Sequence, residues 1–250
     1  MVRVVARRQF GVSTDLYRAA RLGREQLLEI ASHGFEAVEL VAADGHFDYR
    51  NPGAVADLQQ WLAEAGLDLN TIAVSAAGTS RGQPGDKSGE PPGEDVEQAL
   101  FVARRIPVKV LSVRVGKPKQ AVRLLERLAE LARPLGVTVA VDSRSESMTP
   151  MGSLVHFVSD GVDASVGIAL DCAAAHKAGD LIDAIELASE HLAAVRVPAQ
   201  SSIDWSQAMT TLQKVGYDGV LMFDGAGSAK ETLARARQTR DTMERWLTST

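Results

Sequence analysis

The sequence predicts an α/β protein folded as a single (β/α)8 TIM barrel, on three observations. A unit of amphipathic helix, glycine and short apolar strand recurs along the chain, and residues 34–40 (GFEAVEL) and 216–222 (GYDGVLM) are near-copies of it. A glycine just past a helix adopts the left-handed conformation that ends it at little cost. The 250 residues suit one barrel of ordinary size. No Gly-x-Gly-x-x-Gly motif follows the first strand, so a dinucleotide-binding sheet lacks its main signal.

Eight strands are expected, most of them apolar on successive residues, as is typical of parallel strands buried on both faces. In order, they cover residues 9–13, 37–41, 68–74, 109–115, 138–141, 166–170, 193–197 and 219–223. Helical periodicity fills the intervals between them: Leu27 and Ile30 mark the first helix, and Leu233, Ala236 and Met243 mark the last. Eight such alternations favour a closed barrel over an open sheet.

One segment interrupts this alternation. Residues 76–93 (AAGTSRGQPGDKSGEPPG) have the glycine, proline and serine content of a loop and follow the third strand on the face where barrels carry their chemistry. Two interpretations stay open, an active-site lid and a simple surface excursion.

Composition narrows the class of protein. The formal charge is −5 and the 27 Lys and Arg residues are scattered, which argues against a nucleic-acid partner. No apolar run is long enough to span a membrane, and residues 1–8 lack the apolar core of a signal peptide, so we expect a cytoplasmic protein with one domain over residues 1–250. The lone Cys172 excludes an intrachain disulfide and a multi-cysteine zinc site.

Polar residues follow the apolar strands of the second half. In order they are Asp142, Asp171, Arg196 and Asp224. A barrel points several such residues at a common axis on its catalytic face. Carboxylates that converge there repel each other and need a cation, a proton or an arginine between them.

Several segments together resemble a known family. They are Val38-Glu39-Leu40, Leu170-Asp171 followed by residues 175–180 (AHKAGD), residues 203–205 (IDW) and residues 216–220 (GYDGV). These resemble the xylose isomerase-like TIM barrels, which include sugar and sugar-phosphate isomerases, ketose 3-epimerases, hydroxypyruvate isomerases, inosose dehydratases and apurinic endonucleases. The resemblance spans nearly the whole chain. It implies proton transfer next to the carbonyl of a small polyhydroxylated substrate. The acidic balance and the few histidines argue against an endonuclease.

The resemblance also implies one divalent ion, manganese, magnesium or cobalt, held by a Glu after strand five, an Asp after strand six, a His on strand seven and a Glu after strand eight. This chain has Asp142, Asp171, Arg196 and Asp224 at those positions, and only Asp171 is identical. Arginine stays protonated and has no lone pair, so it cannot be a ligand. We therefore expect the Arg196 guanidinium in the ion's place, paired with Asp171 and with one or both of Asp142 and Asp224. The alternative is that the three aspartates and His176 bind a metal in a rearranged geometry.

The resemblance further implies roles for these groups. Asp142 and Asp224 are the expected acid/base pair, with Asp171 and Arg196 on the side of the oxyanion. Possible substrate-binding residues are Glu39, His46, Arg114 and His176, and Arg114 with Arg144 could bind a phosphate or carboxylate. Arg144 itself is expected to be a solvated loop residue, and Glu146 a flexible-loop carboxylate.

The changes at three of the four expected metal-ligand positions leave a second function open. The chain could be a catalytically silent barrel that binds a sugar-like or anionic ligand. In either case the expected partner is a small sugar-like molecule and not a nucleic acid or a membrane. A homo-oligomer is possible, because relatives often form dimers or tetramers.

Overall fold

The structure, a computed structural model, describes residues 8–76, 92–116, 118–145, 150–162 and 165–249 and contains a closed barrel of parallel strands in chain order. Each strand pairs with its neighbours in the sequence, and β1 closes on β8. The strands are β1 Phe10–Ser13, β2 Ala37–Val41, β3 Asp68–Ser75, β4 Val110–Arg114, β5 Thr138–Asp142, β6 Val166–Asp171, β7 Leu192–Pro198 and β8 Leu221–Asp224. The predicted fold class is confirmed.

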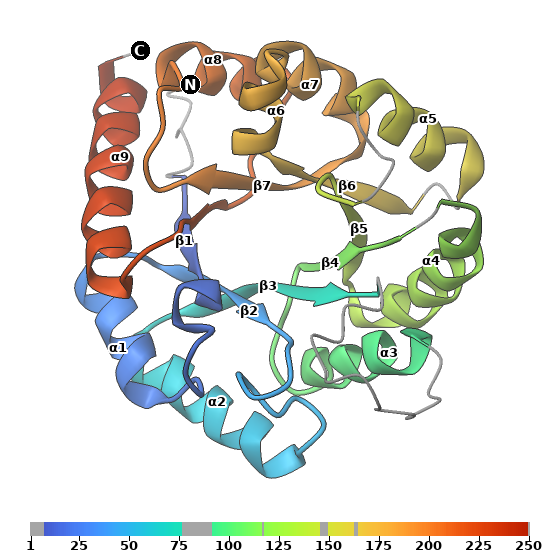
Figure 1. Cartoon of the computed structure of the whole chain (residues 1–250). Coiled ribbons are helices and arrows are strands. Elements are labelled where there is room, and N and C mark those ends of the chain that lie inside the picture. Colours follow the sequence, from blue (N-terminus) through green and yellow to red (C-terminus); the bar gives the residue numbers. More distant parts are fainter. Residues whose placement is uncertain (1–7, 77–91, 117, 146–149, 163–164, 250) are drawn as a thin grey trace, which may run out of the picture.

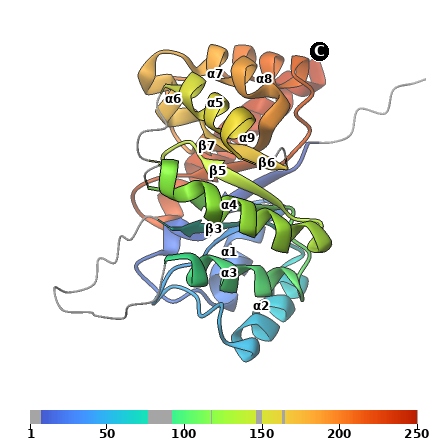
Figure 2. The ribbon, with the colours of Figure 1, turned by 90° about the vertical axis from the view of Figure 1, so that its right-hand side faces the viewer.

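Helices surround the barrel on its outer side (Figures 1 and 2). They are α1 Arg24–Ser32, α2 Pro52–Ala65, α3 Pro92–Ala103, α4 Pro118–Ala132, α5 Met151–Gly161, α6 Cys172–Ala178, α7 Leu181–Ala188, α8 Trp205–Lys214 and α9 Ala229–Ser249, with short 3-10 turns at Thr14–Tyr17, Arg133–Leu135 and Ser189–His191. Hydrogen bonds join α9 to the carboxyl end of α1, where Nη1 of Arg240 donates to the carbonyl oxygens of His33 and Gly34 at 3.0 and 2.7 Å.

Glycines end helices where the sequence predicted them. Gly34, Gly66, Gly136 and Gly216 all have positive φ angles, between 65° and 80°. At Gly66 a Cβ would meet no atom within 4 Å, so the left-handed backbone alone, at φ 65°, favours glycine.

Five strands, β3 and β5 to β8, extend one residue further than predicted at their carboxyl ends, and three of them end in an aspartate. Asp142, Asp171 and Asp224 are the last residues of β5, β6 and β8, and not the first residues of the loops. Each is still in register with the next strand or the previous one: Asp142 lies opposite Ala169, Asp171 opposite Arg196, and Asp224 opposite Pro198. The barrel ladder thus fixes the backbone of all three aspartates.

Small side chains fill the barrel interior below these aspartates. Buried alanines at Ala140, Ala169 and Ala194 form one cluster with Val110, and each lies two residues before a polar residue of the same strand. Side chains alternate along a strand with a period of two, so the polar residues face the same interior one layer nearer the carboxyl ends. Small residues beneath them leave room for long polar side chains across the barrel axis.

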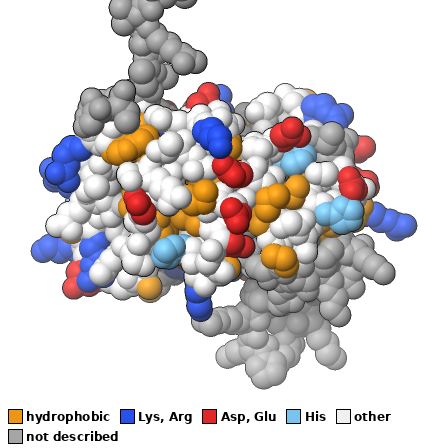
Figure 3. All heavy atoms as spheres, turned by 90° about the horizontal axis from the view of Figure 1, so that it is seen from above, with side chains coloured by type: hydrophobic (Ala, Val, Ile, Leu, Met, Phe, Trp, Pro, Cys, Tyr) orange, Lys and Arg blue, Asp and Glu red, His pale blue; other side chains and the backbone are white. Residues whose placement is uncertain are grey.

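Two expectations fall outside the described residues: the lid or surface loop, of which residues 77–91 are not described, and Glu146. None of the described helices is both long and apolar enough to cross a lipid bilayer. On the face that carries α6, α7 and α8, acidic, basic and hydrophobic side chains are interspersed (Figure 3).

Candidate functional site

A buried guanidinium crosses the barrel at its carboxyl-terminal end. Arg196, on β7, has a side chain only 2% exposed. Its Nη2 lies 2.6 Å from Oε2 of Glu39 on β2, and its Nη1 lies 2.8 Å from Oδ2 of Asp142 on β5. Nε donates to both oxygens of Glu39 at 3.2 Å. A bidentate pair of this kind fixes the guanidinium in position and orientation.

Glu39 is the partner that the sequence did not assign to Arg196. The predicted pair with Asp142 is confirmed, whereas a pair with Asp171 is wrong. The Asp171 carboxylate instead caps the N-terminus of α6, where its Oδ1 accepts a hydrogen bond from the backbone N–H of Ala174 at 2.8 Å. Glu39 is held in place by Ser13, whose hydroxyl donates to Oε1 at 2.8 Å.

A second guanidinium joins three aspartates. Arg144 donates from its backbone N–H and from Nε to Oδ1 of Asp142, at 2.8 and 3.0 Å, and from Nη2 to Oδ2 at 2.7 Å. The same side chain lies 3.5 Å from Asp171 and 3.6 Å from Asp224. It is 30% exposed, so it also faces the mouth of the barrel. The expectation of a solvated loop residue is wrong for Arg144.

The two neighbours of Arg144 explain its position. The Ser143 hydroxyl accepts from the backbone N–H of Asp171 at 2.8 Å, and the Ser145 hydroxyl accepts from that of Val115 at 3.0 Å. These bonds attach the residues after β5 to the ends of β6 and β4. The sequence signal was an arginine between two serines directly after a strand, a pattern suited to backbone capping.

The pKa values of Asp142 and Asp224 are shifted in opposite directions. Burial alone would raise the pKa of Asp142, but hydrogen bonds from Arg144 and the charge of Arg196 outweigh it and hold that pKa well below its usual range. Burial and the nearby charge of Asp171 raise the pKa of Asp224 to about 7, against the opposing charges of Arg144 and Arg196. Asp142 is therefore a permanent anion, and Asp224 exchanges a proton near neutral pH.

This raised pKa predicts a pH-dependent stability difference for Asp224→Asn. The folded protein keeps the proton of Asp224 up to about pH 7, whereas the unfolded chain loses it near its ordinary pKa of 3.8. Wild-type stability therefore falls as pH rises through this interval, and the amide variant lacks that fall. We expect Asp224→Asn to be more stable by on the order of 2–4 kcal/mol at pH 8 and nearly equal at pH 4, measured by urea denaturation. A constant difference at both pH values would contradict the raised pKa.

The two histidines named as substrate contacts bond to groups other than the carboxylates and guanidinium groups described above. His46 is 1% exposed, and its ring nitrogens lie 3.0 Å from the carbonyl oxygen of Ala20 and 3.1 Å from the Thr14 hydroxyl. Burial lowers its pKa, so the ring is neutral and ties the loop after β2 to the first turn. His176 is exposed on α6 and pairs with the Ser202 hydroxyl at 3.0 Å.

The carboxylates fit guanidinium groups better than a divalent ion. An ion of this kind needs several oxygen or nitrogen lone pairs directed at one point. Here the oxygens of Asp142 accept from Arg144 and Arg196, and those of Glu39 accept from Arg196 and Ser13. Among the described residues, no group of three or more His, Cys, Asp or Glu side chains is placed to hold a metal ion. As arranged, the candidate ligand set therefore does not fit a metal.

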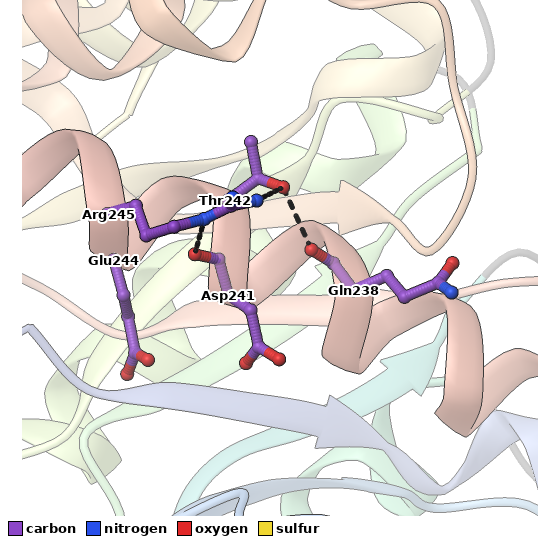
Figure 4. Close-up of a pocket in the computed structure, with 5 residues that line it drawn as sticks. All are labelled: Gln238, Asp241, Thr242, Glu244 and Arg245. Atoms are coloured by element: carbon purple, nitrogen blue, oxygen red, sulfur yellow. Dashed lines mark hydrogen bonds between the residues drawn. The ribbon is translucent and has the colours of Figure 1, made fainter.

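A surface hollow on the second half of α9 is a separate feature (Figure 4). Its side chains are bonded along the helix: Arg245 donates to the Asp241 carbonyl oxygen at 3.1 Å and to the Thr242 hydroxyl at 3.2 Å, and Thr242 donates to the Gln238 carbonyl oxygen at 3.0 Å. Since α9 begins after the carboxyl end of β8 and runs back along the barrel, this hollow lies away from the aspartates.

Solved structures with a similar fold include two sugar epimerases and a magnesium-bound barrel. D-psicose 3-epimerase, solved in the presence of D-fructose, is 16% identical with a TM-score of 0.78, covering 96% of this chain and 99% of that one. The 3-keto-D-glucoside 4-epimerase from E. coli is 15% identical with a TM-score of 0.73, covering 96% and 100%. A xylose isomerase-like TIM barrel protein from Mycobacterium smegmatis, in complex with magnesium, is 14% identical with a TM-score of 0.74, covering 97% of each chain. At these identities the likeness shows the fold alone.

The sequence itself gives the family. No curated protein sequence matches this chain. The family profile described as "Xylose isomerase-like TIM barrel" matches residues 27–250, nearly the whole barrel from α1 onward. The chain therefore belongs to the xylose isomerase-like TIM barrel family.

Proposed function

We propose that the protein is a sugar or sugar-phosphate isomerase that transfers a proton between neighbouring carbons without a divalent ion. The observation that carries the proposal is the pair of Asp224 and Arg144 at the barrel mouth. Asp224 has a pKa of about 7 and lies 3.6 Å from the guanidinium of Arg144. Their side chains are 25% and 30% exposed, so both can touch a substrate. A base that titrates near the working pH beside a fixed cation suits proton abstraction next to a carbonyl.

The reaction needs only these groups and the substrate. The Asp224 carboxylate removes the proton from the carbon next to the carbonyl, and the electron pair of that C–H bond forms the carbon–carbon double bond of an enediolate. The carbonyl oxygen receives the negative charge, which the Arg144 guanidinium stabilises. The Asp224 carboxyl then returns the proton to the former carbonyl carbon, while the neighbouring hydroxyl becomes the new carbonyl and its proton passes to the first oxygen.

Among the described residues, Asp224 is the one carboxyl with a raised pKa, which favours isomerisation over epimerisation. Return of the proton to the other face of the same carbon requires a second acid on that face. Asp142 was the expected second member of the acid/base pair, but its pKa lies far below neutrality and its side chain is 4% exposed. A single carboxyl can serve both carbons of an enediolate from one face, as an aldose–ketose interconversion requires.

Arg196 has an indirect part in this scheme. Its side chain is 2% exposed, so it does not touch a substrate. It holds Asp142, and Asp142 in turn orients Arg144 through four hydrogen bonds. Arg196 is thus a positioning residue, and together with Arg144 it supplies the positive charge of the site.

Deuterium exchange tests the proposal. A panel of aldoses, ketoses and their phosphates is incubated with the protein in D₂O, and loss of C–H signal next to the carbonyl is followed by NMR. We expect exchange into at least one substrate pair, together with interconversion of its aldose and ketose. Binding without exchange for every member would contradict the proposal and support a catalytically silent barrel, which the changed ligand set favours as the second candidate.

A further inference from the structure

The mouth of the barrel holds a third arginine, Arg114, beside Arg144 and Arg196. Arg114 is the last residue of β4, and its side chain faces the interior because it lies two residues after Ser112, whose hydroxyl accepts from Arg196 at 3.3 Å. Among the described residues, its Nε is buried without a hydrogen-bond partner. Its Nη2 lies 3.7 Å from Oδ2 of Asp142, beyond hydrogen-bond distance.

The neighbouring anion is already shared. Oδ2 of Asp142 lies 2.7 Å from Nη2 of Arg144 and 2.8 Å from Nη1 of Arg196, which leaves Arg114 as the third and most distant cation around one carboxylate oxygen. Burial and the charge of Arg144 lower the pKa of Arg114, because nearby carboxylates do not balance the positive charge of this guanidinium. A partly buried cation in such surroundings gains from an added anion.

We propose that Arg114 binds an anionic group of the substrate, a carboxylate or a phosphoryl group, at the end remote from the reacting carbon. The side chain is 41% exposed, so its guanidinium is open to the mouth. In the closed barrel β4 lies four strands from β8 in either direction, so Arg114 and Asp224 stand on opposite sides of the axis. A substrate whose reacting carbon lies at Asp224 therefore extends across the mouth towards Arg114.

This inference rests on the proposed function in one respect, that the bound anion is part of the substrate. Anion binding itself can be measured without turnover. The probes are sorbitol, D-gluconate and sorbitol 6-phosphate, which share a six-carbon polyol chain and differ in their terminal group. Calorimetric titration of each into the wild-type protein compares a neutral end with a carboxylate and a phosphate. We expect at least one anionic probe to bind about tenfold more tightly than sorbitol, and the tighter of the two identifies the anionic group.

Variants assign the binding to Arg114. Arg114→Gln should weaken binding of the preferred anion by about tenfold or more, the effect of one or two lost charge-assisted hydrogen bonds, and leave sorbitol unchanged. Arg114→Lys keeps the charge and should retain part of the affinity. The control is Arg127→Gln, on the outer side of α4, where the arginine is 66% exposed and pairs with Glu97. It should bind like the wild type.

The outcomes separate this inference from the proposed function. Anionic probes that bind no more tightly than sorbitol, or that bind equally well to Arg114→Gln, would overturn the anion site. Anion binding that depends on Arg114 in a protein without deuterium exchange would support the anion site and contradict the isomerase. Exchange into neutral ketoses that is unaffected by Arg114→Gln, in a protein that binds no anionic probe, would support the isomerase and overturn the anion site.

Discussion

Replacement of Arg196 by methionine should destabilise the protein by about 3–5 kcal/mol, the usual effect of removing one partner from a buried ion pair. Methionine keeps much of the volume of the side chain and removes the charge. Among the described residues, Glu39, 3% exposed, would then keep only the Ser13 hydroxyl as a hydrogen-bond partner, and Asp142 would lose one of the two guanidinium groups that donate hydrogen bonds to it. The measurement is the free energy of unfolding at pH 7, from urea denaturation.

A double variant distinguishes loss of the ion pair from loss of packing. Glu39→Gln removes the buried negative charge, so Arg196→Met combined with Glu39→Gln should be more stable than Arg196→Met alone. The control is Lys214→Met, which removes an exposed ion pair of 3.1 Å with Glu186 and should change stability by less than about 1 kcal/mol. Equal stability of Arg196→Met and the wild type would show that the guanidinium does not hold the site together.

Asp224→Asn should reduce deuterium exchange by about 10²- to 10⁴-fold, the usual contribution of a general base. The amide is nearly the same size as the carboxyl but cannot accept the substrate proton. The raised pKa adds a pH signature: wild-type exchange should rise with pH up to about 7 and then level, because the carboxylate is the active form and its pKa is about 7. The residual exchange of Asp224→Asn should lack this rise.

The matched control for this variant is Asp57→Asn on the exposed side of α2, which should leave both rate and pH profile unchanged. An Asp224→Asn variant that exchanges at the wild-type rate would place the base on another residue. A wild-type exchange rate that does not change between pH 5 and pH 8 would show that Asp224 is not the base that removes the proton.

Sequence patterns predicted the barrel because its signals are local. The glycines past the helices, such as Gly66, and the apolar runs of the strands each depend on neighbouring residues. The strand ends were less predictable. Whether Asp142 closes β5 or opens the next loop depends on pairing with Ala169 of β6, a residue far along the sequence.

The members of the site were largely predictable, but their partners were not. Arg196 was expected beside aspartates, yet its bidentate partner Glu39 is separated from it by 157 residues. Arg144 resembled a solvated loop residue because the two serines beside it suggest backbone capping but do not show that they bond at the ends of β6 and β4. Such bonds follow from the closure of the barrel, which a sequence pattern does not contain.

The most direct measurement is deuterium exchange by metal-stripped protein before and after addition of Mn²⁺. The protein is treated with a chelator and dialysed, and exchange into the best substrate of the panel is followed at pH 8. If Arg144 and Arg196 supply the positive charge of the site, the stripped protein exchanges at its full rate and Mn²⁺ leaves that rate unchanged. Exchange that is absent from the stripped protein and restored by Mn²⁺ would contradict a metal-independent isomerase.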